Sequence, residues 1–229
     1  MDLKYTITRR PRRRTLSIVI AHDNRIVVRA NQSMPDKAIV KFIESKRDWI
    51  SKTLNFNNAC LSLYTPKQFI CGEKFMYLGE DFSLLIERGK NRKPELKEGI
   101  FVIRIPKHIK NSVDYGRDKL VQWYRTQSYQ ILNERVDLYR RILNVQIKNI
   151  KIRSLKSTWA NCSCLGVLTF SWRLIMAPLN IVDYVVVHEL AHRLQHNHSA
   201  RFWKQVEKTI PEYKACKKWL RDNERRFRW

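Results

Sequence analysis

The sequence contains few of the residues that mark disordered or fibrous chains. It has only six Gly and seven Pro in 229 residues, whereas hydrophobic residues make up 44% and aromatic residues 11%. This much apolar side chain can offset the conformational entropy lost on folding, so the composition excludes a low-complexity or disordered chain. The length suits one domain, or one domain with a smaller module.

Long apolar runs and paired cysteines are also missing. No run approaches the roughly 18 apolar residues that a membrane-spanning helix needs, and the start, Met-Asp-Leu-Lys-Tyr, does not resemble a secretory signal. The five cysteines are odd in number, and Cys162-Ser-Cys164 is too tightly spaced for a C-x-x-C metal or redox pattern. We therefore expect a cytoplasmic protein with reduced thiols and no membrane span.

Acidic residues are scarce relative to basic ones. The 45 Lys and Arg outnumber 21 Asp and Glu, which gives a net charge of +24. This excess favours polyanionic partners such as nucleic acid, nucleotides or acidic lipid surfaces. Because the charge is spread along the chain, a solvated basic surface explains it as well. The run Arg9-Arg10-Pro11-Arg12-Arg13-Arg14 has the same two interpretations, a solvated edge or a phosphate clamp.

Hydrophobic periodicity predicts a β-rich N-terminal region with one helix. The helix begins at Pro35 and ends at the Asn-rich stretch Asn55–Ala59. A polar loop is expected over Arg88–Glu98. The expected β segments are a hairpin of Thr15–Ala21 and Arg25–Ala30 around His22-Asp23-Asn24, a segment from Lys67 to Glu87 with a turn at Gly79-Glu80-Asp81, and Ile100–Ile105. We assign residues 1–110 to this region.

The second half, residues 111–229, is predicted to form a separate domain. A stripe of apolar residues predicts one long helix over Asn111–Asn144. The expected strands are Ile147–Leu155, Thr158–Cys162, Val167–Trp172 and Leu174–Met176, and the expected helices are Leu179–Gln195, Ser199–Thr209 and Pro211–Asp222. The predicted fold class is therefore α+β, with a small β-sheet beside several helices.

The segment from His188 to His192 carries the pattern His-Glu-x-x-His directly after an apolar run. On a helix, residues four apart lie about 40° from each other and about 6 Å along the axis, so both imidazoles can reach one ion. Glu189 then lies beside the metal, where it can act as the general base that activates a zinc-bound water. Imidazole ligands favour zinc over magnesium or calcium.

A catalytic zinc site needs a third protein ligand, and two histidines compete for that role. His196 would lie about 12 Å along the axis from His188 if the helix continued, too far to share one ion. Asn197 tolerates the left-handed conformation that ends many helices, and a turn there would bring His198 back toward the metal. We therefore prefer His198 and regard His196 as a rim residue or a substrate contact.

The residues around this motif resemble the YgjP-like metallopeptidase-like family, a group of compact zincins related to the minigluzincins. The resemblance rests on Val185–His192, on Asn197-His198-Ser199-Ala-Arg-Phe202-Trp203 and on Ser171–Pro178. It implies a zincin fold, His188, His192 and His198 as zinc ligands, Glu189 as the base, and the strand before the active-site helix as the edge of the cleft. The chain departs from the family at Trp159-Ala160-Asn161-Cys162, where Trp-Gly-Ser-Cys is common.

Three functions fit these features. In a metallopeptidase, an extended peptide would bind the sheet edge near Trp159–Ser163, and Tyr213, His196 or Asn161 could donate to the oxyanion. In a nucleotide or phosphoanhydride hydrolase, the basic surface would gather the substrate. A nucleic-acid-associated module with a non-catalytic zinc is the third, although structural zinc sites usually have four protein ligands. The candidate substrate-binding residues are Trp159, Asn161, His196 and Tyr213.

Overall fold

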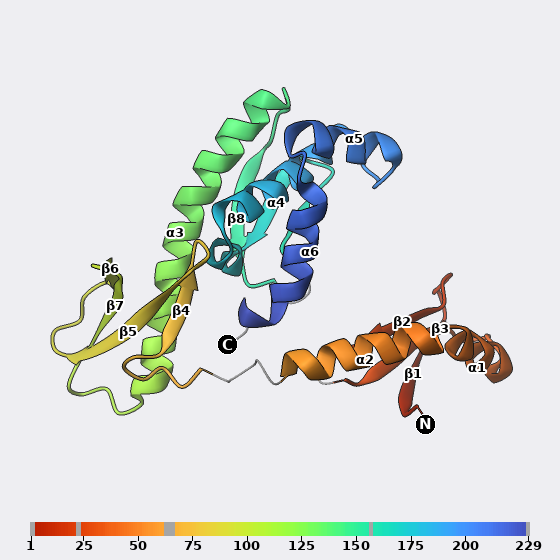
Figure 1. The fold of residues 1–229 in the computed structure, drawn as a ribbon, viewed down its shortest axis with the longest axis horizontal. Coiled ribbons are helices and arrows are strands. Elements are labelled where there is room, and N and C mark those ends of the chain that lie inside the picture. The colour runs from red at the N-terminus through yellow and green to blue at the C-terminus, as the bar shows by residue number, and fades with distance from the viewer. Residues whose placement is uncertain (1–2, 22–23, 62–66, 156–157, 228–229) are drawn as a thin grey trace. The chain divides into compact units, whose positions relative to one another are not determined.

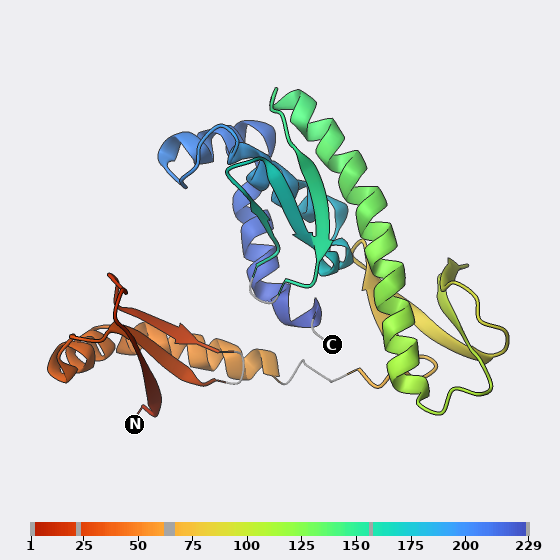
Figure 2. The same cartoon turned by 180° about the vertical axis from the view of Figure 1, so that it is seen from behind.

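The computed structural model describes residues 3–21, 24–61, 67–155 and 158–227 (Figures 1 and 2). Its contacts divide the chain into two compact units, Met1–Thr65 and Pro66–Trp229. This division differs from the boundary predicted between residues 110 and 111. The contacts that join residues 66–110 to the rest of the second unit explain this difference, and they are described below.

The first unit is a three-stranded sheet with two helices packed on one face. Its elements are β1 (Tyr5–Arg10), β2 (Ser17–Ile20), β3 (Ile26–Asn31), α1 (Asp36–Ser45) and α2 (Arg47–Leu61). The strand order is β1-β3-β2, with β1 parallel and β2 antiparallel to β3. The β2–β3 pair confirms the predicted hairpin, whose turn residues His22 and Asp23 lie outside the described residues. The core of the unit consists of Ile26, Val28, Ala30, Ile39, Ile43 and Ile50.

The helix expected after Pro35 is divided into α1 and α2. Lys46 has φ −110° and ψ 8°, and its amide donates to the carbonyl of Ile43, three residues back, at 3.0 Å. This tighter bond interrupts the α-helical pattern for one residue, while Ile43 and Ile50 on either side remain in the same core. The expectation that Asn55–Ala59 ends the helix was wrong, because α2 continues to Leu61.

The second unit begins with a four-stranded sheet in the order β4-β5-β7-β6. Its strands are β4 (Lys74–Tyr77), β5 (Glu80–Arg88), β6 (Glu95–Lys97) and β7 (Ile100–Ile105). The predicted β segment Lys67–Glu87 contains strands β4 and β5, but its turn lies at Leu78 and Gly79 rather than at Gly79-Glu80-Asp81. The predicted strand Ile100–Ile105 is confirmed. Strand β6 was not predicted, because it lies in the expected polar loop; it pairs with β7 through Leu96 and Phe101.

The long helix α3 (Ser112–Ile142) confirms the predicted apolar stripe. In both views it runs beside the sheet of β4–β7 and beside β8 (Figures 1 and 2). The Tyr124 hydroxyl donates to the carbonyl of Met76 at 2.5 Å, and the Ser128 hydroxyl donates to the carbonyl of Trp172 at 2.9 Å. Helix α3 therefore connects the first sheet of this unit to the region of the His-Glu-x-x-His motif.

A second, three-stranded sheet follows α3. It contains β8 (Asn149–Arg153), β9 (Ala160–Cys162) and β10 (Val167–Ser171) in the order β8-β10-β9, so β9 is an edge strand. The predicted strand Leu174–Met176 was wrong, because Trp172–Met176 forms a 3₁₀ helix, η1. All of these residues except Arg173 are buried, and a buried apolar run of this length does not by itself distinguish strand from helix.

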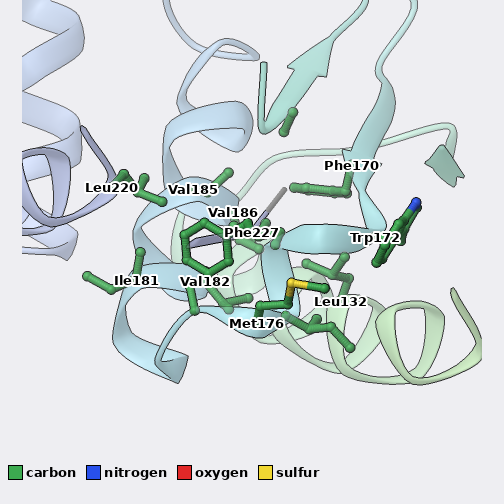
Figure 3. Close-up of a cluster of buried hydrophobic side chains, with 14 of the residues drawn as sticks. Leu132, Phe170, Trp172, Met176, Ile181, Val182, Val185, Val186, Leu220 and Phe227 are labelled. Atoms are coloured by element: carbon green, nitrogen blue, oxygen red, sulfur yellow. The ribbon is translucent and has the colours of Figure 1, made fainter. Parts of the chain in front are cut away.

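The C-terminal part is helical, as predicted. It comprises α4 (Leu179–Ala191), α5 (Ala200–Thr209), α6 (Tyr213–Asn223) and the 3₁₀ helix η2 (Glu224–Phe227). Figure 3 shows α4 packed among buried apolar side chains, including Ile181, Val185, Leu220 and Phe227. Within the described residues, no helix combines the length and apolar character needed to cross a bilayer. The α+β fold class is confirmed.

The tip of the β4–β5 hairpin contacts η1 and Pro178, which directly precede α4. The amides of Leu78 and Gly79 donate to the carbonyls of Ile175 and Met176 at 2.8 and 3.0 Å. Gly79 has φ +91°, and a Cβ at this position would lie 2.7 Å from Cγ of Pro178. This close approach is one reason that residues 66–110 belong with the motif-bearing half of the chain.

Gly79→Ala should destabilise the second unit more than Gly99→Ala does. Both glycines have positive φ, but a Cβ on Gly99 meets nothing within 4 Å. Each substitution carries the cost of a left-handed alanine, about 1 kcal/mol or more. Gly79→Ala adds overpacking against Pro178, an extra cost of about 1 to 3 kcal/mol. Urea unfolding followed by tryptophan fluorescence measures the difference, and equal losses for the two variants would contradict it.

Candidate metal centre

Helix α4 presents the His-Glu-x-x-His motif from an otherwise buried segment. Pro178, with φ −52° and ψ 150°, precedes the helix, and α4 residues from Ile181 to Val187 and from Glu189 to Ala191 are buried. Only His188 interrupts this stretch with partial exposure. A helix that is apolar almost all round must be surrounded by its neighbours, so its few polar side chains occupy fixed positions.

The chain turns sooner after the motif than the sequence suggested. Helix α4 ends at Ala191, and the amides of Leu194 and Gln195 both donate to the carbonyl of Ala191, at 3.0 and 2.9 Å. Asn197 is not among the residues with positive φ, so its expected left-handed conformation was wrong. Helix α5 then starts at Ala200, where the Ser199 hydroxyl accepts from an amide in the first turn.

This turn brings His198 to the two histidines of α4. The candidate ligand atoms of His188, His192 and His198 all lie within 4.8 Å of one another. The two Nε2 atoms of His188 and His198 are 3.0 Å apart. In the described part of the chain, these three residues form the one cluster suited to a metal ion. His196 is exposed and does not belong to this cluster.

The three rings fit a zinc ion by geometry. Two nitrogens bound tetrahedrally to zinc at about 2.0–2.1 Å would be about 3.3 Å apart, close to the separation found between His188 and His198. The Nδ1 atom of His192 lies 3.3 Å from the carbonyl oxygen of Gln195. Donation from this nitrogen to the carbonyl leaves Nε2 of His192 available as a ligand.

The electrostatics of the cluster also suit a metal. The pKa of His188 is lowered to about 3. Burial is the largest cause, and the neighbouring His192 and His198 make smaller contributions. Burial likewise lowers the pKa of His192, with a second contribution from His198. Both imidazoles are therefore neutral at physiological pH, which is the form that binds metal ions.

Aromatic rings from α5 pack against the three histidines. The Phe202 ring centroid lies 5.0, 4.7 and 4.8 Å from those of His188, His192 and His198. Trp203 stacks on His198 at 5.7 Å and on Tyr213 at 5.1 Å. These contacts restrict the orientation of the His198 ring, whose side chain is otherwise exposed.

Glu189 lies beside the cluster and is only 6% exposed. Burial raises its pKa to about 7, because the charged carboxylate loses solvation. A carboxyl group with a pKa near neutral can both accept and return a proton, as a general acid–base group must.

A cleft of about 340 Å³ opens next to His188 and Glu189. One wall comes from the region of β9, one from α4, and one from α6 and η2. Its lining residues are Thr158, Trp159, Ala160, Tyr184, Val185, His188, Glu189, Lys217, Leu220, Arg221 and Glu224. The cleft therefore joins the candidate metal cluster to the edge strand of the small sheet.

The four predicted substrate-binding residues have different positions. Trp159 lines the cleft and packs edge-on against Phe227, with ring centroids 5.1 Å apart. Asn161 lies on β9 opposite Thr169 and is exposed, but neither it nor His196 lines the cleft. Tyr213 is 9% exposed and belongs to the ring stack with Trp203.

Sequence reasoning missed the basic wall of the cleft. Lys217 and Arg221 are four residues apart on α6, and Leu220 lies between them in the lining. The spacing places both cations on one helical face. That face could be identified in the sequence, but nothing local indicates that it adjoins His188 and Glu189.

The chain is similar to proteins described as metallopeptidases. Residues 14–223 match the YgjP-like, metallopeptidase domain family. Among solved structures, the chain matches the metallopeptidase zymogen abylysin from Pyrococcus abyssi with 28% sequence identity and a TM-score of 0.37, over 39% of this chain and 90% of that chain. No curated protein matched the sequence. Because the family match covers most of the residues, the chain belongs to the YgjP-like metallopeptidase domain family.

Proposed function

We propose that this protein is a zinc-dependent metallopeptidase with Glu189 as its general base and His188, His192 and His198 as its zinc ligands. The proposal is supported chiefly by the convergence of three imidazoles within 4.8 Å beside a buried carboxyl group. Three protein ligands, rather than four, are typical of catalytic zinc sites. When bound, zinc supplies a Lewis acid that polarises a carbonyl and makes water a stronger nucleophile.

Residues of the chain itself would transfer the proton and bind the substrate. Glu189 would accept a proton from the attacking water and return it to the leaving amine, since its side chain adjoins both His188 and the cleft. An extended peptide would add to the free edge of β9, where main-chain hydrogen bonds could hold it. Trp159, in the cleft wall, would pack against a substrate side chain.

A second candidate function is nucleotide or phosphoanhydride hydrolysis. The observation that favours it is the pair of cations, Lys217 and Arg221, in the wall of the cleft. Both side chains could bind a phosphate group. In a peptidase, the same two residues would favour a substrate with an acidic side chain.

His198→Ala should abolish stoichiometric zinc binding, whereas His196→Ala should retain it. The first variant removes one of the three converging rings, and the second removes an exposed ring outside the cluster. Loss of a ligand should weaken zinc affinity by more than about a hundredfold, since second-shell changes already cost 10- to 100-fold. Elemental analysis and competition with a chromophoric chelator measure this. Zinc loss in His196→Ala with retention in His198→Ala would reassign the third ligand.

Glu189→Gln should retain zinc but lose turnover. The amide cannot accept the proton, and general-base catalysis commonly contributes about 10²- to 10⁴-fold to the rate. Zinc-loaded wild type and variant should be assayed against a peptide library and against nucleoside triphosphates. Cleavage of peptides that disappears in the variant supports the peptidase, and phosphate release that disappears supports the second candidate.

The matched control for this experiment is Glu207→Gln. This carboxylate is exposed on α5 and lies 3.9 Å from Lys214, outside the cleft. Its loss should leave turnover within about twofold, because an exposed ion pair contributes little. Full activity in Glu189→Gln, with zinc content unchanged, would refute the role given to Glu189.

A further inference from the structure

Helices α1 and α2 of the first unit both pack on one face of its sheet, and neither covers the opposite face. Side chains alternate along β3, so Ile26, Val28 and Ala30 face the core with α1 and α2. Val27 and Arg29 therefore face the opposite side of the sheet. The register places Thr8 of β1 opposite Arg29.

This uncovered face contains a groove of about 300 Å³ that is lined largely by arginines. The lining residues are Thr8, Arg10, Arg13, Val27 and Arg29. The lining contains three cations and no carboxylate, and it includes no aromatic ring. We call these five residues the arginine groove.

Hydrogen bonds to neutral groups hold Arg13 in place. Its Nε donates to the carbonyl of Thr15 at 2.7 Å, and its Nη2 donates to the Ser17 hydroxyl at 2.8 Å. The side-chain amide of Asn31 donates to the carbonyl of Arg13 at 2.8 Å, which fixes the turn that follows β1. Two of the five N–H donors of the guanidinium are used in this way, so three remain for a ligand, and no carboxylate of the described residues forms an ion pair with Arg13.

The neighbouring Arg9 has a different role. Its guanidinium donates to the carbonyls of Asn31, Gln32 and Met34, and it pairs with Asp36 at the start of α1. Arg9 and Arg10 point to opposite sides of β1 because successive side chains of a strand alternate. The arginine-rich run is thereby divided into a structural residue, Arg9, and the groove residues Arg10 and Arg13.

We propose that the arginine groove binds the phosphodiester backbone of nucleic acid. Planar guanidinium groups bind phosphate oxygens through paired hydrogen bonds, and the Thr8 hydroxyl can donate to the same group. Contacts to phosphate groups carry no sequence information, so the groove should bind without sequence preference. Arg12 and Arg14 are exposed in the same run and would meet adjacent phosphates of a continuous strand.

Nucleic acid is a better ligand for this groove than an acidic peptide. Residues 1–65 contain 13 Lys and Arg against 5 Asp and Glu, and the whole chain carries a net charge of +24. Nucleic acid carries a negative charge on every nucleotide, so it can contact many of these basic residues at once. Its binding also releases condensed counterions. A single carboxylate would use only the groove itself.

The test measures binding of full-length protein to a fluorescein-labelled, mixed-sequence DNA of 20 nucleotides, as a single strand and as a duplex. Fluorescence anisotropy over a salt series gives the affinity and its salt dependence. Arg10→Gln/Arg29→Gln should weaken binding by about tenfold or more. It should also lower the salt slope by about 1.4 for the single strand, or 1.8 for the duplex, as expected for two lost phosphate contacts. The form that wild-type protein binds more tightly at the same salt concentration is the preferred form.

The matched control is Lys37→Gln/Lys41→Gln, which removes the same charge from exposed positions on α1. It should weaken binding by less than about threefold. Thr8→Glu, which places a carboxylate in the groove, is a second variant that should weaken binding without removing an arginine. Glu189→Gln should bind DNA as wild type does, so a failure of the proposed peptidase activity would not affect this result.

Three outcomes would overturn the proposal. The first is unchanged DNA affinity in both groove variants when their thermal unfolding matches wild type. The second is an equal loss in the groove double variant and the α1 control, which would indicate a diffuse basic surface. The third is poly-glutamate of equal charge displacing the DNA as well as unlabelled DNA does, which would identify the groove as a site for acidic peptides.

Discussion

The candidate metal centre depends on the enclosure of helix α4 by its neighbours. Asp183 on this helix is 8% exposed and receives a bidentate pair of hydrogen bonds from Arg135 of α3, at 2.6 and 2.7 Å. Such a pair overcomes the cost of burying two charges only when its geometry is good, and breaking it leaves one charge uncompensated. It therefore fixes the rotation of α4 relative to α3. That rotation determines where His188 and Glu189 point.

The surroundings of the three histidines serve both packing and chemistry. Phe202 contacts all three rings, and Trp203 lies between His198 and Tyr213. Burial lowers the pKa of His188 and of His192, so the packing that orients these two rings also keeps them neutral. Glu189 experiences the same burial in the opposite sense, because its neutral form is the protonated one. One environment thus prepares the ligands and the proposed base together.

Local patterns in the sequence predicted most elements but not how they meet. Each successful prediction rested on the spacing of residues within a single helix or strand. Examples are the four-residue spacing of His188 and His192, the apolar stripe of α3 and the strand Ile100–Ile105. The break at Lys46 and the 3₁₀ helix Trp172–Met176 depend on packing against other segments, which the spacing of apolar residues within one segment does not predict. The cleft wall formed by Lys217 and Arg221 depends on contacts between distant segments, so its position next to α4 could not be derived. His198 could be preferred over His196 because the length of a helix limits which rings can meet.

The contact between Gly79 and Pro178 limits how far this fold can be shortened. The hairpin tip occupies the carbonyls of Ile175 and Met176, just before α4. A fragment beginning at α3 would retain every proposed zinc ligand, yet it would expose those carbonyls and the apolar side of Tyr124 to water. The smallest autonomous unit should therefore begin ahead of β4. In related chains, insertions and deletions should accordingly spare this hairpin and accumulate in the segment that joins it to the N-terminal sheet.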